Sequence, residues 1–179
     1  SSSNKDFEGE EVENIDGLFQ VNSFSESNYA YILDSQDFNI PAITYDLLSN
    51  EVYTSASFKP FTIQTSSGVK TFNYGSLIIP LSIQKKLNSN ELYEKMMSVQ
   101  EKYNVNIYSV QSGLSSTGID LGSGYVMPIH KPNAMMLIGT GVRAYEAGEV
   151  WHLLDQRVGM PITKIPMRNF DNISMDKYN

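Results

Sequence analysis

Residues 139–144 read Gly-Thr-Gly-Val-Arg-Ala and match the glycine pattern of dinucleotide-binding turns, G-x-G-x-x-[G/A]. Glycines in such a turn let backbone amides approach a pyrophosphate group at the positive end of the following helix. Gly139, Gly141 and Arg143 are therefore candidate anion-binding residues. The chemistry that they indicate is recognition of a nucleotide or another small anion.

Two features of the neighbouring sequence oppose that interpretation. The acidic residue expected roughly 20 positions after the turn is absent, because residues 162–165 read Ile-Thr-Lys-Ile. Glu146 is expected in the first turn of the helix, where its carboxylate would repel a bound anion. The same glycines are also typical of a tight strand-to-helix turn without a ligand, so both interpretations stay open.

The helix expected after this turn carries four polar side chains of unassigned role: Tyr145, Glu146, Glu149 and His152. The tyrosine and the two glutamates together suggest a general base, although paired carboxylates on an exposed helix are more often simply solvated. Glu149 and His152 occupy neighbouring helical turns, as two metal ligands would. A catalytic zinc site usually needs three protein ligands, and the other histidine, His130, is expected in a loop. We therefore predict no metal site, and we interpret His152 as a surface or hydrogen-bonded buried residue.

Other catalytic chemistry is not indicated. The chain has no cysteine, which excludes a thiol nucleophile, a thiolate metal site and disulfide bonds. Gly113 and Gly118 have the glycine spacing of a phosphate loop, but Ile-Asp follows them where a lysine and a hydroxyl residue are required. Two S-x-x-K matches lack the companion motifs of that enzyme class. We predict no catalytic residue and no bound cofactor in this chain.

The composition narrows the function classes further. The 179 residues are 41% hydrophobic, which suffices for an ordinary buried core, and their net charge of -7 disfavours nucleic acid or an anionic membrane surface as a partner. No run of 18 apolar residues exists, so no membrane span is predicted. Residues 1–16 combine six acidic residues with one lysine and are predicted to be a flexible tail or linker, with an acidic interaction tail as the alternative. The chain lacks an initiator methionine and is expected to be a segment of a longer protein.

The elements that would position these residues alternate between strands and helices. Apolar runs at 29–34 and 77–79 predict buried strands, and a helix is expected to follow each of them, from about residue 40 and over 88–103. A β-hairpin insertion is predicted near residues 60–74, around a Ser-Ser-Gly turn. Alternation of this kind predicts an α/β fold with a mainly parallel sheet and helices on both faces.

The second half continues the pattern after a Gly- and Ser-rich loop at 112–124. A strand at 134–138, a helix over about 143–158 and a returning strand at 160–165 predict a parallel βαβ unit. The expected organisation is a tail at residues 1–16, an α/β domain at 17–130 and this βαβ unit at 131–179, packed on the same sheet.

One long motif carries a family resemblance. Residues 141–157 read Gly-Val-Arg-Ala-Tyr-Glu-Ala-Gly-Glu-Val-Trp-His-Leu-Leu-Asp-Gln-Arg, and further matching stretches lie at 112–114, 118–123 and 75–80. The chain resembles the C-terminal region of large bacterial zinc-carboxypeptidase-like proteins. In them a metallocarboxypeptidase domain is followed by a region similar to class I glutamine amidotransferases. The resemblance implies a flavodoxin-like or class I glutamine-amidotransferase-like sheet, with residues 131–179 similar to the start of the amidotransferase-like domain.

The resemblance carries no catalytic residue onto this chain. The family's zinc ligands lie in a His-x-x-Glu motif, whereas His130 is followed by Lys-Pro-Asn and His152 by Leu-Leu-Asp, and the amidotransferase cysteine has no counterpart. It therefore implies a non-catalytic accessory domain of an exported, periplasmic or extracellular, zinc carboxypeptidase, with zinc in a separate peptidase domain. The implied partners are neighbouring domains of the same polypeptide. A homodimer through an open sheet edge near residue 165 and a nucleotide- or anion-binding domain are the alternatives.

Overall fold

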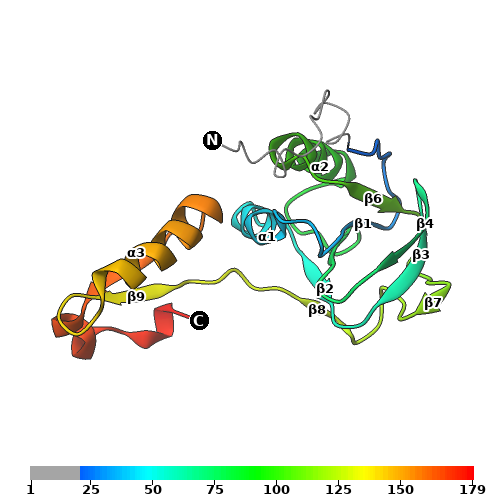
Figure 1. Ribbon diagram of the computed structural model, residues 1–179. Coiled ribbons are helices and arrows are strands. Elements are labelled where there is room, and N and C mark those ends of the chain that lie inside the picture. The colour runs from blue at the N-terminus through cyan, green and yellow to red at the C-terminus, as the bar shows by residue number, and fades with distance from the viewer. Residues whose placement is uncertain (1–20) are drawn as a thin grey trace, which may run out of the picture.

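The computed structural model describes residues 21–179, so the segment predicted to be a tail at residues 1–16 lies outside the described part (Figure 1). The larger part of the molecule is built around a five-stranded sheet. A smaller unit, residues 134–179, lies beside it and is called here the C-terminal unit (Figure 1).

The elements follow one another along the chain with short connections. In order they are β1 (Ala30–Leu33), α1 (Ile40–Ser49), β2 (Ser55–Ser57), β3 (Phe61–Thr65), β4 (Gly68–Phe72), β5 (Leu77–Pro80), α2 (Ser89–Tyr103), β6 (Ile107–Val110), β7 (Thr117–Gly118), β8 (Val126–Pro128), β9 (Met135–Ile138), α3 (Ala144–Trp151), the π-helical segment η1 (His152–Arg157), β10 (Thr163–Pro166) and the 3-10 helices η2 (Met167–Asn172) and η3 (Met175–Lys177). Among the described residues, no helix combines the length and apolar character that crossing a bilayer requires.

The main sheet has the strand order β6-β1-β5-β2-β8, and every neighbouring pair in it is antiparallel. The prediction of a mainly parallel sheet is therefore wrong. Strands β1 and β2 run in the same direction around α1, but β5 lies between them. Strands β5 and β6 likewise run in the same direction around α2, with β1 between them. Each strand-helix-strand crossover is thus split by an antiparallel strand, and local periodicity does not reveal such an insertion.

The two faces of the sheet are covered by different elements, as the alternation of side chains along β1 shows. Tyr31 and Leu33 point to the face covered by α1 and α2, where they join buried residues of both helices. Ala30 and Ile32 point to the opposite face and pack against the hairpin of β3 and β4. The predicted placement of helices on both faces is wrong, because α1 and α2 lie on the same face.

The hairpin at 61–72 belongs to a second sheet of order β4-β3-β7. Its strands carry Phe61, Ile63 and Phe72, which are buried against the main sheet. The rings of Phe61 and Phe72 stack with centroids 5.3 Å apart. The hairpin therefore closes the core where helices were expected to do so.

The C-terminal unit contains a parallel pair of strands, in which Met135 is opposite Thr163 and Leu137 opposite Ile165. This pair forms a two-stranded sheet of its own and is not hydrogen-bonded to the main sheet. Helix α3 and η1 connect the two strands, and Gly159 follows η1 with a φ of 71°. In this unit only Met160 and Ile165 are buried apolar residues, so its core is thin.

Candidate functional site

The turn that enters α3 requires both of its glycines. Gly139 has a φ of 102° and Gly141 a φ of 89°, and these left-handed conformations favour glycine because it has no Cβ. The Val142 N–H donates to the Gly139 carbonyl oxygen at 3.0 Å and closes the turn. A Cβ added at either glycine would meet no atom within 4 Å. Backbone conformation, and not close packing, therefore explains the two glycines, and the space beside them is open.

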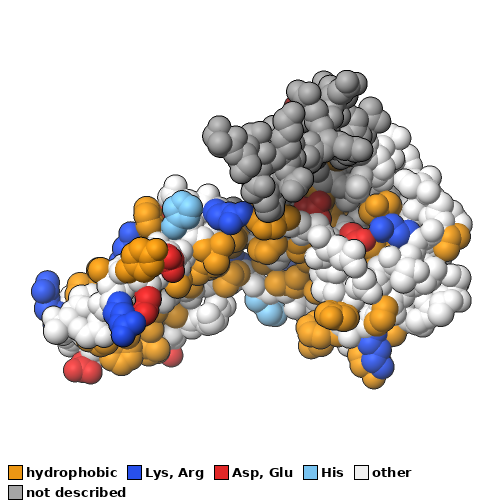
Figure 2. Space-filling model, viewed as in Figure 1, with side chains coloured by type: hydrophobic (Ala, Val, Ile, Leu, Met, Phe, Trp, Pro, Cys, Tyr) orange, Lys and Arg blue, Asp and Glu red, His pale blue; other side chains and the backbone are white. Residues whose placement is uncertain are grey.

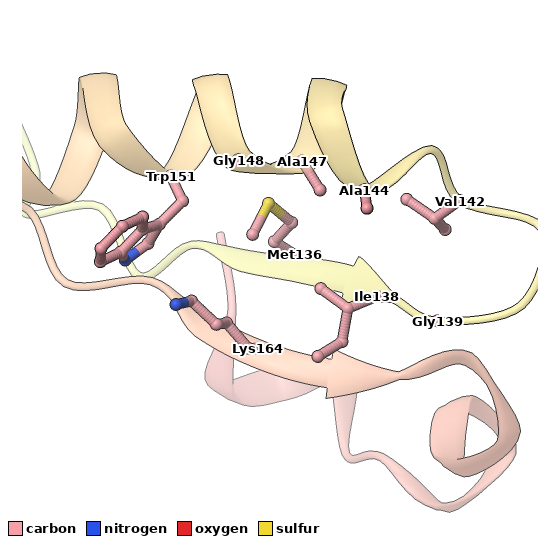
Figure 3. Close-up of a pocket in the computed structure, with 9 residues that line it drawn as sticks. All are labelled: Met136, Ile138, Gly139, Val142, Ala144, Ala147, Gly148, Trp151 and Lys164. Atoms are coloured by element: carbon pink, nitrogen blue, oxygen red, sulfur yellow. The ribbon is translucent and has the colours of Figure 1, made fainter.

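A cavity of about 260 Å³ begins at this turn and runs beneath α3 (Figure 3). Helix α3 lies above it and β9 and β10 below, with Val142 at one end and Trp151 and Lys164 at the other (Figure 3). The Lys164 Nζ lies 4.0 Å from the centroid of the Trp151 ring, within reach of a cation–π interaction. The lining of the cavity consists of Met136, Ile138, Gly139, Val142, Ala144, Ala147, Gly148, Trp151 and Lys164. The cavity is thus largely apolar and contains one cationic group.

Arg143 does not line this cavity. Its Nη1 donates to Glu146 Oε1 at 3.1 Å, in an exposed ion pair across the first turn of α3. The carboxylate of Glu146 also compensates the positive end of the helix dipole. The structure therefore brings Arg143 together with Glu146, the residue expected to oppose an anion, whereas Gly139 lines the cavity beneath the helix.

The other motif residues lie on a different surface of α3. Tyr145, Glu149 and His152 fall at the spacing of one helical face and line a shallow depression of about 440 Å³ together with Ala144 and Gly148. Glu149 and His152 are the metal-ligand types in this depression. Throughout residues 21–179 no group of three or more His, Asp or Glu side chains is placed to hold a metal ion. The depression therefore offers one imidazole, one carboxylate and one phenol at the molecular surface.

The strongest charge cluster was not singled out from the sequence, and it lies on the larger part. Asp46 on α1 accepts hydrogen bonds from Lys95 Nζ at 2.8 Å, Lys102 Nζ at 2.7 Å and the Tyr103 hydroxyl at 2.9 Å. Burial acts to raise the pKa of Asp46, but these hydrogen bonds outweigh it and lower the pKa to about 2. These two lysines and the tyrosine belong to α2, so the cluster ties the two helices together. Side-chain pairs on a helix can be found in a sequence when they lie four residues apart or fewer, and the Asp46 cluster does not meet that condition.

The C-terminal unit meets the larger part at an apolar groove, at the Arg157–Phe38 pair and through hydrogen bonds of Asn179 with Asn133 and Lys131. An open groove of about 330 Å³ lies between α1 and η1, lined by apolar side chains of both and by His130. At its sides Lys131 Nζ lies 5.2 Å from the Tyr45 ring centroid, and the Arg157 guanidinium lies 4.7 Å from that of Phe38. His130 is therefore placed beside this junction, away from the motif residues of α3.

Comparison with known proteins adds no relationship to this geometry: the chain matches no protein-family model, no curated protein sequence and no solved structure.

Proposed function

We propose that this chain is a non-catalytic accessory domain of a zinc-carboxypeptidase-like protein, and that its C-terminal unit packs against a neighbouring domain of the same polypeptide. Zinc would be held by a separate peptidase domain, and the whole protein would be exported. The motif at 141–157 is what connects the chain to that family. The observation that carries the accessory role is the apolar surface of the C-terminal unit.

That surface is extensive for so small a unit. Helix α3 has no buried residue, and hydrophobic side chains gather over this part of the molecule in the space-filling view (Figure 2). Exposed fractions of 39–51% are found for Val150, Leu153, Met167, Phe170 and Met175. These side chains lie on α3 and η1 and on η2 and η3, and apolar side chains left exposed by a unit with so thin a core are available to a neighbouring domain.

The small sheet supports the same proposal. Within the described residues, β9 and β10 pair only with each other, so each strand has an open edge. A two-stranded sheet is marginally stable in water unless another element packs on it, and open edges invite pairing with a further strand. A neighbouring domain that extends or covers this sheet would satisfy both requirements.

The apolar surface can be tested in the full chain with the double substitution Val150→Lys and Leu153→Lys. We expect the fluorescence of the apolar dye anilinonaphthalene sulfonate to fall, because two charges interrupt the surface. The matched control Val69→Lys changes an exposed valine on β4, 66% accessible, and should leave dye binding unchanged. Equal dye binding by all three proteins would remove the support for the accessory role.

Turnover assays test the non-catalytic part of the proposal. The full chain is incubated with peptides bearing a free C-terminal carboxylate and with glutamine, with and without added zinc. No hydrolysis is expected. Zinc-dependent hydrolysis that disappears in Glu149→Gln would show that the chain is itself an enzyme.

A second copy of the chain is the competing occupant of the same surface. Sedimentation of the full chain over a range of concentrations distinguishes the two. A dimer that forms at low concentration and is abolished by the double lysine substitution, but not by Val69→Lys, would show that a second copy of the chain, and not a neighbouring domain, covers this surface.

The cavity beside Gly139 favours one alternative function, the binding of a nucleotide or small anion. Gly139, where a Cβ would meet nothing within 4 Å, and the Lys164 ammonium line this cavity, so an anion there could contact the backbone of the turn and a cation. Trp151 lines the cavity and is the one tryptophan of the chain, so its fluorescence reports on ligand binding directly. Titration with a dinucleotide and with inorganic phosphate should then give a saturable change that Lys164→Gln weakens and the distant Lys86→Gln does not. A flat titration with both ligands would exclude this alternative.

A further inference from the structure

A second cavity, wide open to solvent, lies in the larger part of the molecule between Tyr29 and the loop at 111–125. Its volume is about 780 Å³, within the range of small-molecule sites. Its lining differs from that of the cavity beneath α3, because tyrosine, serine and glycine dominate it. This composition combines rigid amphipathic rings with adaptable hydrogen-bonding groups and is typical of recognition surfaces.

The loop that forms this cavity is held in place by its own hydrogen bonds. The Leu121 N–H donates to the Gly113 carbonyl oxygen at 2.9 Å, and the Ser115 N–H donates to Asp120 Oδ1 at 2.8 Å. Gly113 lies against the Tyr29 ring so closely that a Cβ would come within 2.3 Å of it. Gly118, with a φ of 88°, approaches the Pro60 carbonyl oxygen in the same way. The cavity is therefore formed before any ligand enters, which reduces the entropy cost of binding.

Three of the polar side chains in the lining, Ser112, Ser123 and Asp120, retain hydrogen-bonding capacity toward a ligand. Ser112 Oγ accepts from the Leu114 N–H and Ser123 Oγ accepts from the Tyr125 N–H, so each hydroxyl can still donate its proton. Asp120 Oδ2 has no hydrogen-bond partner among the described residues, whereas Oδ1 is used by Ser115. These three side chains thus present two hydroxyl donors and one carboxylate acceptor.

The charges around the cavity select against ionic ligands. Asp120 is the one charged residue of the lining, and its carboxylate would repel an anion. A cation would be repelled by Lys59, whose Nζ lies 3.7 Å from the centroid of the Tyr125 ring. A neutral ligand with several hydroxyl groups meets neither obstacle, and it can donate to Asp120 and accept from the serines.

We propose that this cavity binds a neutral saccharide. Sugar hydroxyls would pair with Asp120, Ser112 and Ser123, and the apolar C–H face of the ring would lie against tyrosine. Tyr29 and Tyr125 are 36% and 48% exposed, and because Lys59 lies over one face of the Tyr125 ring, a sugar would contact its other face. The proposal is independent of the C-terminal unit and of the accessory role described above.

Calorimetric titration of the full chain with a fixed panel tests it: glucose, galactose, mannose, xylose, N-acetylglucosamine and cellobiose at millimolar concentrations. At least one sugar should bind saturably. Asp120→Asn should lower the affinity for that sugar by about tenfold, because a hydrogen bond to a charged acceptor is lost. Tyr125→Ala should weaken it as well, whereas Tyr74→Ala, at a tyrosine that is 71% exposed outside the lining, should not.

A pair of glycine variants makes the test independent of the polar groups. Gly122 lines the cavity and Gly124 does not, yet neither has a left-handed backbone and a Cβ on either meets nothing within 4 Å. Gly122→Leu should abolish binding by filling the cavity, and Gly124→Leu should preserve it. The proposal is overturned if no sugar of the panel binds, if binding survives Gly122→Leu, or if both leucine variants lose it alike.

Discussion

Asp46 illustrates how one side chain can connect two elements that are far apart in sequence. Its carboxylate is 10% exposed and accepts hydrogen bonds from two lysines and a tyrosine of α2. A carboxylate so placed is stabilised in its charged form, which lowers its pKa. The difference in pKa between the folded and unfolded states corresponds to a free energy of stabilisation. The cluster lies outside the cavities described above, so its role is to fix α1 against α2.

The pH dependence of stability follows from that pKa. The folded-state pKa of Asp46 is about 2, below the value of 3.8 for a free carboxyl. Its contribution, about 2 kcal/mol, is therefore complete above the unfolded-state value and is lost as the pH falls from about 4 toward 2. Urea unfolding of the wild-type chain and of Asp46→Asn should differ by this amount at neutral pH and converge in acid.

Glu51→Gln is the matched control for that measurement. Glu51 pairs with Lys86 at 3.8 Å, and both side chains are more than 60% exposed. Exposed pairs of this kind contribute little, because water screens them. A loss of stability in Glu51→Gln equal to that of Asp46→Asn would show that the burial of Asp46 is not what matters.

Among the elements, α2 shows how far local sequence signals reach. The helix expected over 88–103 is α2, and a capping box begins it: Glu91 N–H donates to Asn88 Oδ1 at 3.0 Å and Asn88 N–H donates to Glu91 Oε2 at 2.8 Å. Leu92, Met96 and Val99 follow at helical spacings of four and three residues, and all three are buried. Signals of this kind succeed because every interacting group lies within a few residues.

Removing the cap should cost a predictable amount. Asn88→Ala leaves the Glu91 N–H without its acceptor and is expected to lower the free energy of unfolding by about 1 kcal/mol. Asn90→Ala, two residues further along in the exposed first turn, provides no cap and should be neutral or slightly stabilising. Equal destabilisation by the two substitutions in urea melts would contradict the capping role.

The pairing of strands could not be predicted in the same way. Apolar runs correctly marked β1 and β5 as buried, but the choice of partner is made between residues as distant as Ala30 and Val110. The cavity at Tyr29 was missed for the same reason, because its lining joins segments more than 80 residues apart. The turn at 139–144 was recognisable since its glycines interact only with their own neighbours.

At the scale of the whole molecule, the two parts differ in how well they are packed. Twelve buried residues form the cluster beneath α1 and α2, whereas the C-terminal unit contributes Met160 and Ile165 to the buried apolar residues. Local opening is easiest where few apolar side chains are buried. The C-terminal unit is therefore the less stable part when nothing covers it.

Amide hydrogen exchange of the full chain measures this difference. Amides of β9 and α3 should exchange faster than those of β1 and α2, because opening the C-terminal unit exposes little buried surface. A protein partner bound to that unit would slow its exchange selectively. Uniform protection along the isolated monomer would show that the thin core is more stable than its burial indicates.

The split crossovers determine the order in which the strands of the main sheet can pair while the chain is being synthesised. Strand β1 leaves the ribosome first of the sheet strands, yet its hydrogen-bonding partners are β5 and β6. A nascent chain that ends before Leu77 has neither partner, and one that ends before Ile107 has only one. The backbone groups of β1 therefore stay bonded to water until first β5 and then β6 have emerged.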